Sequence, residues 1–261
     1  MSAGWQRVTR ANPCPVCKHD RWCCIGETAV NCMRVESAKP ARNGGWMHPL
    51  DAKAAPTTAR KPAPPPPQLT RPDRLLTAWE AATTAAMLRT YAAGLGVSPD
   101  ALRALGAVYS ASHDAWAYPM RAADGQVLGI RLRSDSRKWT VTGSREGLFY
   151  GELGADVLVC EGPTDTAAAL TLGFNAVGRP SCSGTVWHVG ELARLSGIAR
   201  LIVVADDDGP GRRGALRMID ALKIPSKVLA LPCKDIRRFV QLGGTRKLLT
   251  DMLAAQEWSK P

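Results

Sequence analysis

The chain has 261 residues, enough to bury a substantial hydrophobic core, and a formal net charge of +11, which favours a polyanionic partner such as nucleic acid. It contains no apolar run long enough to cross a bilayer, and the N-terminal segment MSAGWQRVTR lacks the apolar core of a signal peptide. These features argue against a membrane protein and predict a cytoplasmic one.

Cysteines concentrate near the N-terminus, where five of the eight lie between Cys14 and Cys32. A disulfide scaffold would not cluster them in this way in so long a chain, whereas a metal site in a reducing compartment would. The pair Cys14-x2-Cys17 forms the tight knuckle of Zn²⁺ sites, in which four thiolates complete a tetrahedral structural centre. We therefore predict that Cys14, Cys17, Cys23 and Cys32 bind zinc in a small β module, residues 1–49.

The third of these ligands is the least constrained. Trp22-Cys23 ends one arm of a predicted hairpin, and Cys32 returns on the other arm. This favours Cys23, with Cys24 or His19 as the alternative.

Residues 50–72 are rich in proline and alanine and have almost no large apolar side chains. They cannot bury a core, so we expect a flexible, extended linker between two folded parts. Residues 1–72 contain 11 Lys and Arg against 4 Asp and Glu, so +7 of the +11 lies in this part of the chain.

Residues 73–154 are predicted to form a mixed α+β subdomain. An apolar helical pattern runs from Asp73 to Leu95, and Ser98-Pro99-Asp100 caps a second, short helix that ends near Leu105. An antiparallel β unit is predicted from the alternating or apolar runs at 116–120, 127–132 and 138–141.

Residues 155–261 alternate between short apolar strands and helical segments. The predicted strands are 157–160, 175–178, 201–205 and 227–231, and the predicted helices between them are 164–173, 186–197 and 212–223. Such alternation predicts a mostly parallel sheet covered by helices, which binds ligands beyond the C-terminal ends of its strands.

Carboxylates follow two of these predicted strands. Glu161 directly follows the first, with Asp165 at the start of the next helix, and the run Asp206 to Asp208 follows the third. Asp206 and Asp208 can point to the same side of an extended segment. Clustered carboxylates repel one another unless a cation neutralises them, and hard oxygen ligands suit Mg²⁺ or Mn²⁺. We favour a metal site over the alternative, a polar turn that caps the following helix.

The pattern Glu161-Gly162-x-x-Asp165, followed by Asp206-x-Asp208-x-x-Gly211, resembles the Toprim signature. Bacterial-type primases, type IA and type II topoisomerases, OLD-family nucleases and recombination mediators share this signature. The resemblance implies a Toprim domain at 155–261, in which Glu161, Asp165, Asp206 and Asp208 are catalytic.

The segment Trp116 to Gly151 is similar to the block that precedes Toprim in bacterial-type replicative primases. Carried over from that family, Arg131, Arg133 and Lys138 would hold template, primer or nucleotide phosphates. The order of zinc module, linker and catalytic core also resembles these primases, in the compact form carried by phages or mobile elements.

The family's third acidic element is altered. Where primases have Asp-x-Asp, this chain has Asp235-Ile236-Arg237, so only Asp235 remains to support a second Mg²⁺ or Mn²⁺. The sequence also lacks a P-loop, so that any replicative helicase would be a separate partner.

The resemblance implies a metal-dependent nucleotidyltransferase that makes short RNA primers from NTPs on single-stranded DNA. Two alternatives stay open. One is a Toprim nuclease, and the other is a non-catalytic zinc and Toprim DNA-binding module of the recombination-mediator type.

Overall fold

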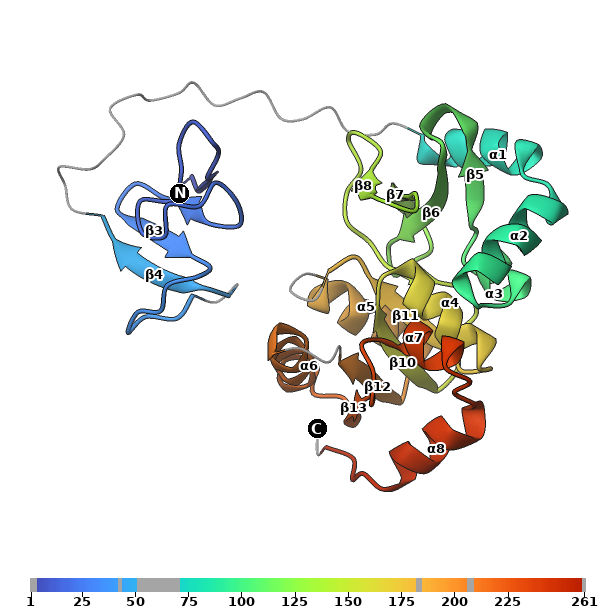
Figure 1. Ribbon diagram of the computed structural model, residues 1–261. Coiled ribbons are helices and arrows are strands. Elements are labelled where there is room, and N and C mark those ends of the chain that lie inside the picture. The colour runs from blue at the N-terminus through green and yellow to red at the C-terminus, as the bar shows by residue number, and fades with distance from the viewer. Residues whose placement is uncertain (1–3, 42–43, 51–70, 182–184, 206–208, 260–261) are drawn as a thin grey trace. The chain divides into compact units, whose positions relative to one another are not determined.

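The computed structural model describes residues 4–41, 44–50, 71–181, 185–205 and 209–259 (Figure 1). The chain divides into two compact units, Met1–Pro65 and Pro66–Pro261. The division falls within the predicted linker, most of which lies outside the described residues. None of the described helices combines the length and the apolar character that a bilayer crossing requires.

The first unit is a four-stranded antiparallel sheet in chain order. Its strands are β1 (Gln6–Arg7), β2 (Cys24–Ile25), β3 (Ala29–Cys32) and β4 (Trp46–Pro49). Its buried cluster consists of Val8, Cys14, Cys23, Ile25, Val30 and Cys32. Half of this small core is cysteine, so apolar burial alone provides little stability here.

The second unit begins with three helices and a four-stranded antiparallel sheet, also in chain order. The helices are α1 (Pro72–Ala82), α2 (Ala85–Leu95) and α3 (Pro99–Ala104), and the strands are β5 (Val108–Ser110), β6 (Ala115–Arg121), β7 (Val127–Arg133) and β8 (Lys138–Thr140), with a 3₁₀ turn at Ala111–His113. The predicted antiparallel unit is confirmed. Helix α1 packs through Leu75, Leu76 and Trp79 on the face of this sheet that carries Ile130 and Leu132.

The single helix predicted from Asp73 to Leu95 is wrong, because the chain breaks it into α1 and α2 at two threonines. The Thr83 hydroxyl donates to the Trp79 carbonyl (2.7 Å) and accepts from the Tyr109 backbone N–H (2.8 Å). The Thr84 hydroxyl accepts from the first turn of α2 (3.2 Å). Threonine side chains thus satisfy backbone groups at both new helix ends, which an apolar-periodicity pattern does not reveal.

The larger sheet follows, with strand order β13-β12-β10-β11-β9. Its strands are β9 (Phe149–Tyr150), β10 (Asp156–Glu161), β11 (Ala176–Arg179), β12 (Arg200–Ala205) and β13 (Ser226–Ala230). The last four are mutually parallel, as predicted, whereas β9 pairs antiparallel with β11. Strands β5 and β9 were not predicted, because two or three residues are too few to show a periodic pattern.

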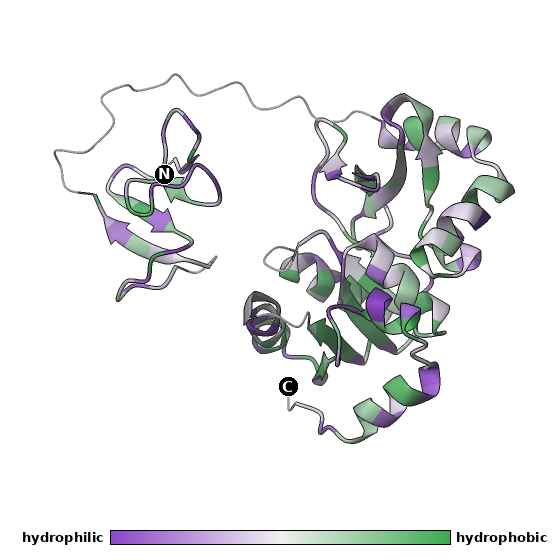
Figure 2. Cartoon of the chain, viewed as in Figure 1, coloured by the Kyte–Doolittle hydropathy of each residue, from purple (hydrophilic) through white to green (hydrophobic). Residues whose placement is uncertain are grey.

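Helices cover both faces of this sheet (Figure 1). They are α4 (Pro163–Thr171), α5 (Val186–Ser196), α6 (Gly209–Leu222), α7 (Ile236–Gln241) and α8 (Arg246–Ala254). Along β10, Leu158 packs in the cluster that contains α4, and Val159 packs in the cluster that contains α5 and α6. The strands are therefore apolar on both faces and form the most hydrophobic part of the unit (Figure 2).

The connections reverse direction between β10 and β12. From β10 the chain passes through α4 to β11, toward one edge of the sheet. From β12 it passes through α6, on the opposite face, to β13 at the other edge. In open α/β sheets such a reversal leaves a crevice beyond the C-terminal strand ends, where ligands bind.

Candidate metal centres and nucleic-acid interface

The structure brings four of the N-terminal cysteines together. The sulfur atoms of Cys14, Cys17, Cys23 and Cys32 all lie within 4.8 Å of one another. The Cys17 and Cys23 sulfurs are 3.6 Å apart, and the Cys23 and Cys32 sulfurs are 4.0 Å apart. A tetrahedral Zn²⁺ with bonds of about 2.3 Å requires sulfur separations of roughly 3.8 Å. The cluster therefore fits a structural zinc ion, and Cys24 lies outside it.

Backbone groups support these sulfurs. The Met33 N–H donates to the Cys23 sulfur (3.4 Å), and the Val35 N–H donates to the Cys32 sulfur (3.3 Å). Lys18, directly after the first cysteine pair, adopts a left-handed conformation with φ of 62°. Such N–H donors orient thiolate ligands and offset their charge. His19 contributes its backbone carbonyl, which accepts from the Cys14 N–H (2.8 Å).

The thiol pKa values show why a cation would matter here. Burial raises the pKa of Cys23 to about 12 and also raises the pKa of Cys14. Burial likewise acts to raise the pKa of Cys17, but a hydrogen bond from the His19 backbone and the neighbouring sulfurs lower it to about 7. A zinc ion would stabilise the thiolate form of all of these groups.

Of the predicted acidic residues, Glu161 lies at the switch between β10 and β12. Strand β10 ends at Glu161, and its parallel neighbour β12 ends at Ala205, directly before Asp206. Val159 pairs with Val203, so each strand ends two residues beyond that pair. Asp206 and Asp208 lie outside the described residues. The half-buried Glu161 therefore occupies the sheet edge where the chain enters the acidic run.

The backbone conformation at the position after Glu161 requires glycine. Gly162 has φ of 82°, a left-handed conformation that L side chains rarely adopt, and it is the N-cap of α4. Its N–H donates to the Arg179 carbonyl (2.7 Å), which ties the end of β10 to β11. Asp165 stands in the first turn of α4, near the positive end of the helix dipole, and Gly162 rather than Asp165 caps that helix.

Asp235 caps a different helix. Its carboxylate accepts a hydrogen bond from the Arg238 backbone N–H (2.7 Å) at the start of α7. The described structure thus assigns one of its oxygens to a helix N-terminus, a role that the sequence comparison did not predict.

The three predicted basic residues lie on one face of the smaller sheet. Arg133 pairs with Lys138 on β8, and Arg131 is two residues before Arg133 on the same strand, so all three project to the same side. A guanidinium nitrogen of Arg131 donates to the Pro180 carbonyl (3.2 Å), which directly follows β11. Burial lowers the pKa of Arg131, although a guanidinium remains charged at neutral pH.

The contact with Pro180 connects the basic face to the acidic edge. Arg179, just before Pro180, is the strand partner of Glu161 across β10 and β11. Arg131 therefore reaches the C-terminal edge of the larger sheet, where Glu161 stands. Arg179 itself is 3% exposed and was missed by the sequence analysis, because an arginine inside an apolar strand pattern carries no distinctive signal.

Aromatic residues continue the basic row across the sheet. Trp116 on β6 pairs with Tyr109 on β5 on one side and with Arg133 on β7 on the other. Arg133 in turn pairs with Lys138 on β8. Tyr91 from α2 stacks on Trp116, with ring centroids 4.3 Å apart and planes 4° apart. This arrangement was also missed, since only the register between strands creates it.

Comparison of this chain with known proteins finds similar folds but no close relative in sequence. No protein-family model matches, and no curated protein matches. The structure is similar to the zinc-binding and RNA polymerase domains of the Aquifex aeolicus primase, with a TM-score of 0.57, 16% sequence identity, and coverage of 72% of this chain and 60% of that one. This chain thus spans about 60% of the length of the Aquifex structure that it matches.

A second similar structure is a bacteriophage T7 complex, in which the lagging-strand DNA polymerase interacts with primase domains of two gp4 subunits bound to an RNA/DNA hybrid and dTTP. The TM-score is 0.54 at 19% identity, over 64% of this chain and 91% of that one. At these identities the similarity shows the fold. This chain is built like the primase domains of a bacterium and of a phage.

Proposed function

We propose that this protein is a DNA primase, a metal-dependent nucleotidyltransferase that makes short RNA primers on single-stranded DNA. The observation that carries the proposal is the primase-like fold. Within this fold, β10 ends at Glu161 and its parallel neighbour β12 ends directly before Asp206. The cysteine cluster supports it, because a zinc-binding domain belongs to the similar Aquifex structure.

In this proposal the acids form the catalytic metal site. Glu161, Asp206 and Asp208 would bind Mg²⁺ or Mn²⁺, and Asp235 would add a carboxylate from the start of α7. A divalent ion bound there would neutralise the incoming triphosphate and the charge that develops during in-line attack by a 3′-hydroxyl. Glu161 would either bind the ion or accept the proton of that hydroxyl, and Asp165 would orient its neighbours.

The basic face would bind the nucleic acid. Arg131, Arg133 and Lys138 form a positively charged strip that leads to the acidic edge. Guanidinium groups bind phosphate oxygens in a bidentate manner, and an ammonium adds a compact charge. We therefore assign this strip to the phosphates of template, primer or nucleotide.

We further propose that the protein belongs to the compact primases of phages or mobile elements, with a replicative helicase as a separate partner. Residues 155–261 would be a Toprim domain, joined to the primase subdomain at 73–154. Cytoplasmic location would accompany this role, since template and NTPs are found there.

Primer synthesis tests the proposal directly. Labelled NTPs are incubated with a mixed single-stranded DNA template and Mg²⁺ or Mn²⁺, and wild type is compared with the double variant Asp206→Ala plus Asp208→Ala. Labelled oligonucleotides from wild type alone are expected. The matched control Asp207→Ala changes the carboxylate that would point away from the ion, and it should retain synthesis.

Other products would favour the alternatives. Shortened template without incorporation would indicate a nuclease, in which water replaces the 3′-hydroxyl. DNA binding that needs no divalent metal and gives no turnover would indicate a non-catalytic binding module.

A further inference from the structure

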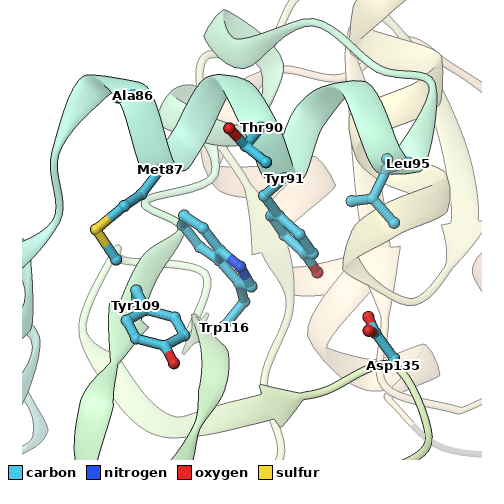
Figure 3. Close-up of a pocket in the computed structure, with 9 residues that line it drawn as sticks. Ala86, Met87, Thr90, Tyr91, Leu95, Tyr109, Trp116 and Asp135 are labelled. Carbon is cyan, nitrogen blue, oxygen red and sulfur yellow. The ribbon is translucent and has the colours of Figure 1, made fainter.

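A hollow of about 630 Å³ lies between α2 and the aromatic end of the smaller sheet (Figure 3). Tyr91, Tyr109 and Trp116 gather under the helix there, together with Met87, and Asp135 lies across from Tyr91. A volume of this size, with mostly apolar lining and few polar groups, is typical of small-ligand sites.

The aromatic residues hold one another in place. The Tyr118 hydroxyl donates to the Tyr91 hydroxyl (3.0 Å), and the Tyr91 ring stacks on Trp116. Tyr109 meets Trp116 edge to face at 5.7 Å, and its hydroxyl donates to Asp114. The aromatic wall is therefore preorganised, so a ligand would bind without the cost of ordering it.

Charge is arranged asymmetrically around this wall. A second hollow shares Tyr91, Tyr109, Trp116 and Asp135 with the first. It adds Arg133 and Arg137, and also Asp114, whose carboxylate accepts from Tyr109. The row Tyr109, Trp116, Arg133 and Lys138 thus passes from rings to cations across the four strands. A ligand with a flat ring at one end and an anionic group at the other matches this order.

Arg237, on α7, lies outside the lining of both hollows, but its charge acts on Tyr91. Burial raises the pKa of Tyr91, and the charges of Arg133 and Arg237 act to lower it. Among the described residues, the buried Nε of Arg237 has no hydrogen-bond partner. This arginine stands where the primase pattern has an acid, so the substitution replaces attraction for a cation with attraction for an anion.

Gly94 lines the hollow from the α2 side without contributing a side chain. Glycine lowers helix stability relative to alanine, and Gly94 lies in the last turn of α2. Its φ is not in the left-handed region, and a Cβ built on it would meet nothing within 4 Å. A larger side chain at position 94 would therefore extend into open space along the hollow, which makes this position suitable for filling the hollow by substitution.

We propose that this hollow binds a nucleotide, with the base against Tyr109 and the Trp116 edge and the phosphate toward Arg133 and Arg137 of the adjoining hollow. Asp135, an acceptor when ionised, would receive N–H donors from the base edge. The source is either a free nucleotide or one nucleotide of single-stranded DNA. The inference deepens the proposed primase function and rests on it for the ligand class.

Two substitutions on α2 test it by filling the hollow. Gly94→Leu and Thr90→Phe place apolar side chains at two lining positions that are exposed, so the core is left intact. Gly94→Ala is the matched control, because it removes the same glycine without filling the space. Circular dichroism checks that each variant is folded.

Binding is measured without added Mg²⁺ or Mn²⁺, so that the acidic site does not contribute. The probes are GMP, followed by calorimetry, and a fluorescein-labelled single-stranded DNA 10-mer, followed by anisotropy. We expect Gly94→Leu and Thr90→Phe to weaken binding of at least one probe about tenfold or more, as loss of one stacked base does, and Gly94→Ala to change it less than about twofold. The affected probe identifies the source.

Unchanged affinity of both folded filling variants for both probes would overturn the inference. Primer synthesis by the same proteins separates this result from failure of the proposed function. If wild type synthesises primers but the filling variants bind both probes normally, only the nucleotide pocket is refuted. If wild type does not synthesise primers but binding depends on the hollow, only the primase assignment is refuted.

Discussion

The two units of this chain achieve stability in different ways. Among the described residues, the buried cluster of the N-terminal unit has six members, three of them cysteines, whereas the second unit has two extensive clusters on the faces of its larger sheet. A small module cannot bury enough apolar surface to offset the conformational entropy lost on folding, so a metal bound by the cysteine cluster would take the place of a core. Substitutions should therefore act locally and by different mechanisms in the two units.

Loss of the metal should have the largest effect, and only on the N-terminal unit. Cys23→Ser removes a predicted ligand whose sulfur lies 3.6 Å from that of Cys17 and 4.0 Å from that of Cys32. Structural zinc contributes about 10–16 kcal/mol in small zinc modules, far more than this core could supply, so the module should unfold. Limited proteolysis with mass spectrometry would detect this as rapid cleavage before residue 50.

Cys24→Ser is the matched control, since Cys24 lies outside the sulfur cluster. It should retain zinc and protease resistance. A folded module in the Cys23→Ser protein, or an equal loss in both variants, would contradict the assignment and indicate another third ligand.

A cavity in the second unit should have the next largest effect and should leave zinc content unchanged. Leu158 lies in the middle of β10 and is 1% exposed. Leu158→Ala should lower the free energy of unfolding by about 2–5 kcal/mol, through lost apolar burial and the cavity left behind. Urea unfolding measures it, with Leu216→Ala, at a side chain that is 57% exposed, as a control that should change stability by about 0.5 kcal/mol or less. A simultaneous loss of zinc would show that the units depend on each other for stability.

Substitutions of Asp235 should have the smallest effect on stability. They can distinguish its role as a helix cap from its proposed role at the metal site. Asp235→Ala removes the cap of α7 and should cost about 1 kcal/mol. Asp235→Asn keeps a capping oxygen and should retain stability, while primer synthesis should fall about tenfold or more if the carboxylate also assists a metal ion. Full activity of a stable Asp235→Asn protein would restrict this residue to capping.

Much of the fold could be predicted because its elements have long, regular patterns. The alternation of apolar strands with helices in residues 155–261 led to the parallel arrangement of β10 to β13, and Ser98 caps α3 as expected, accepting from the Ala101 N–H (3.1 Å). The break at Thr83 and Thr84 could not be predicted, because the apolar pattern continues through it. The Thr83 hydroxyl accepts a hydrogen bond from the backbone N–H of Tyr109, which is distant in the sequence.

Parts of the candidate sites could likewise be predicted from the sequence. The spacing of the cysteines was sufficient to predict a sulfur cluster, since the ligands of a zinc knuckle are close in the chain. The acids at Glu161 and Asp206 were predicted to be neighbours because parallel strands end at one edge, and the pairing of β10 with β12 brings those strand ends together.

Local sequence was enough for features whose partners are near in the chain or whose geometry follows from a repeating element. Which distant residues come into contact depends on the packing of the folded chain. Strand register aligned Trp116 with Arg133, helix packing stacked Tyr91 on Trp116, and the contact of Arg131 with Pro180 joined the basic face to the acidic edge. Long-range side-chain contacts depend on how complete layers pack, and no periodicity along the chain encodes them.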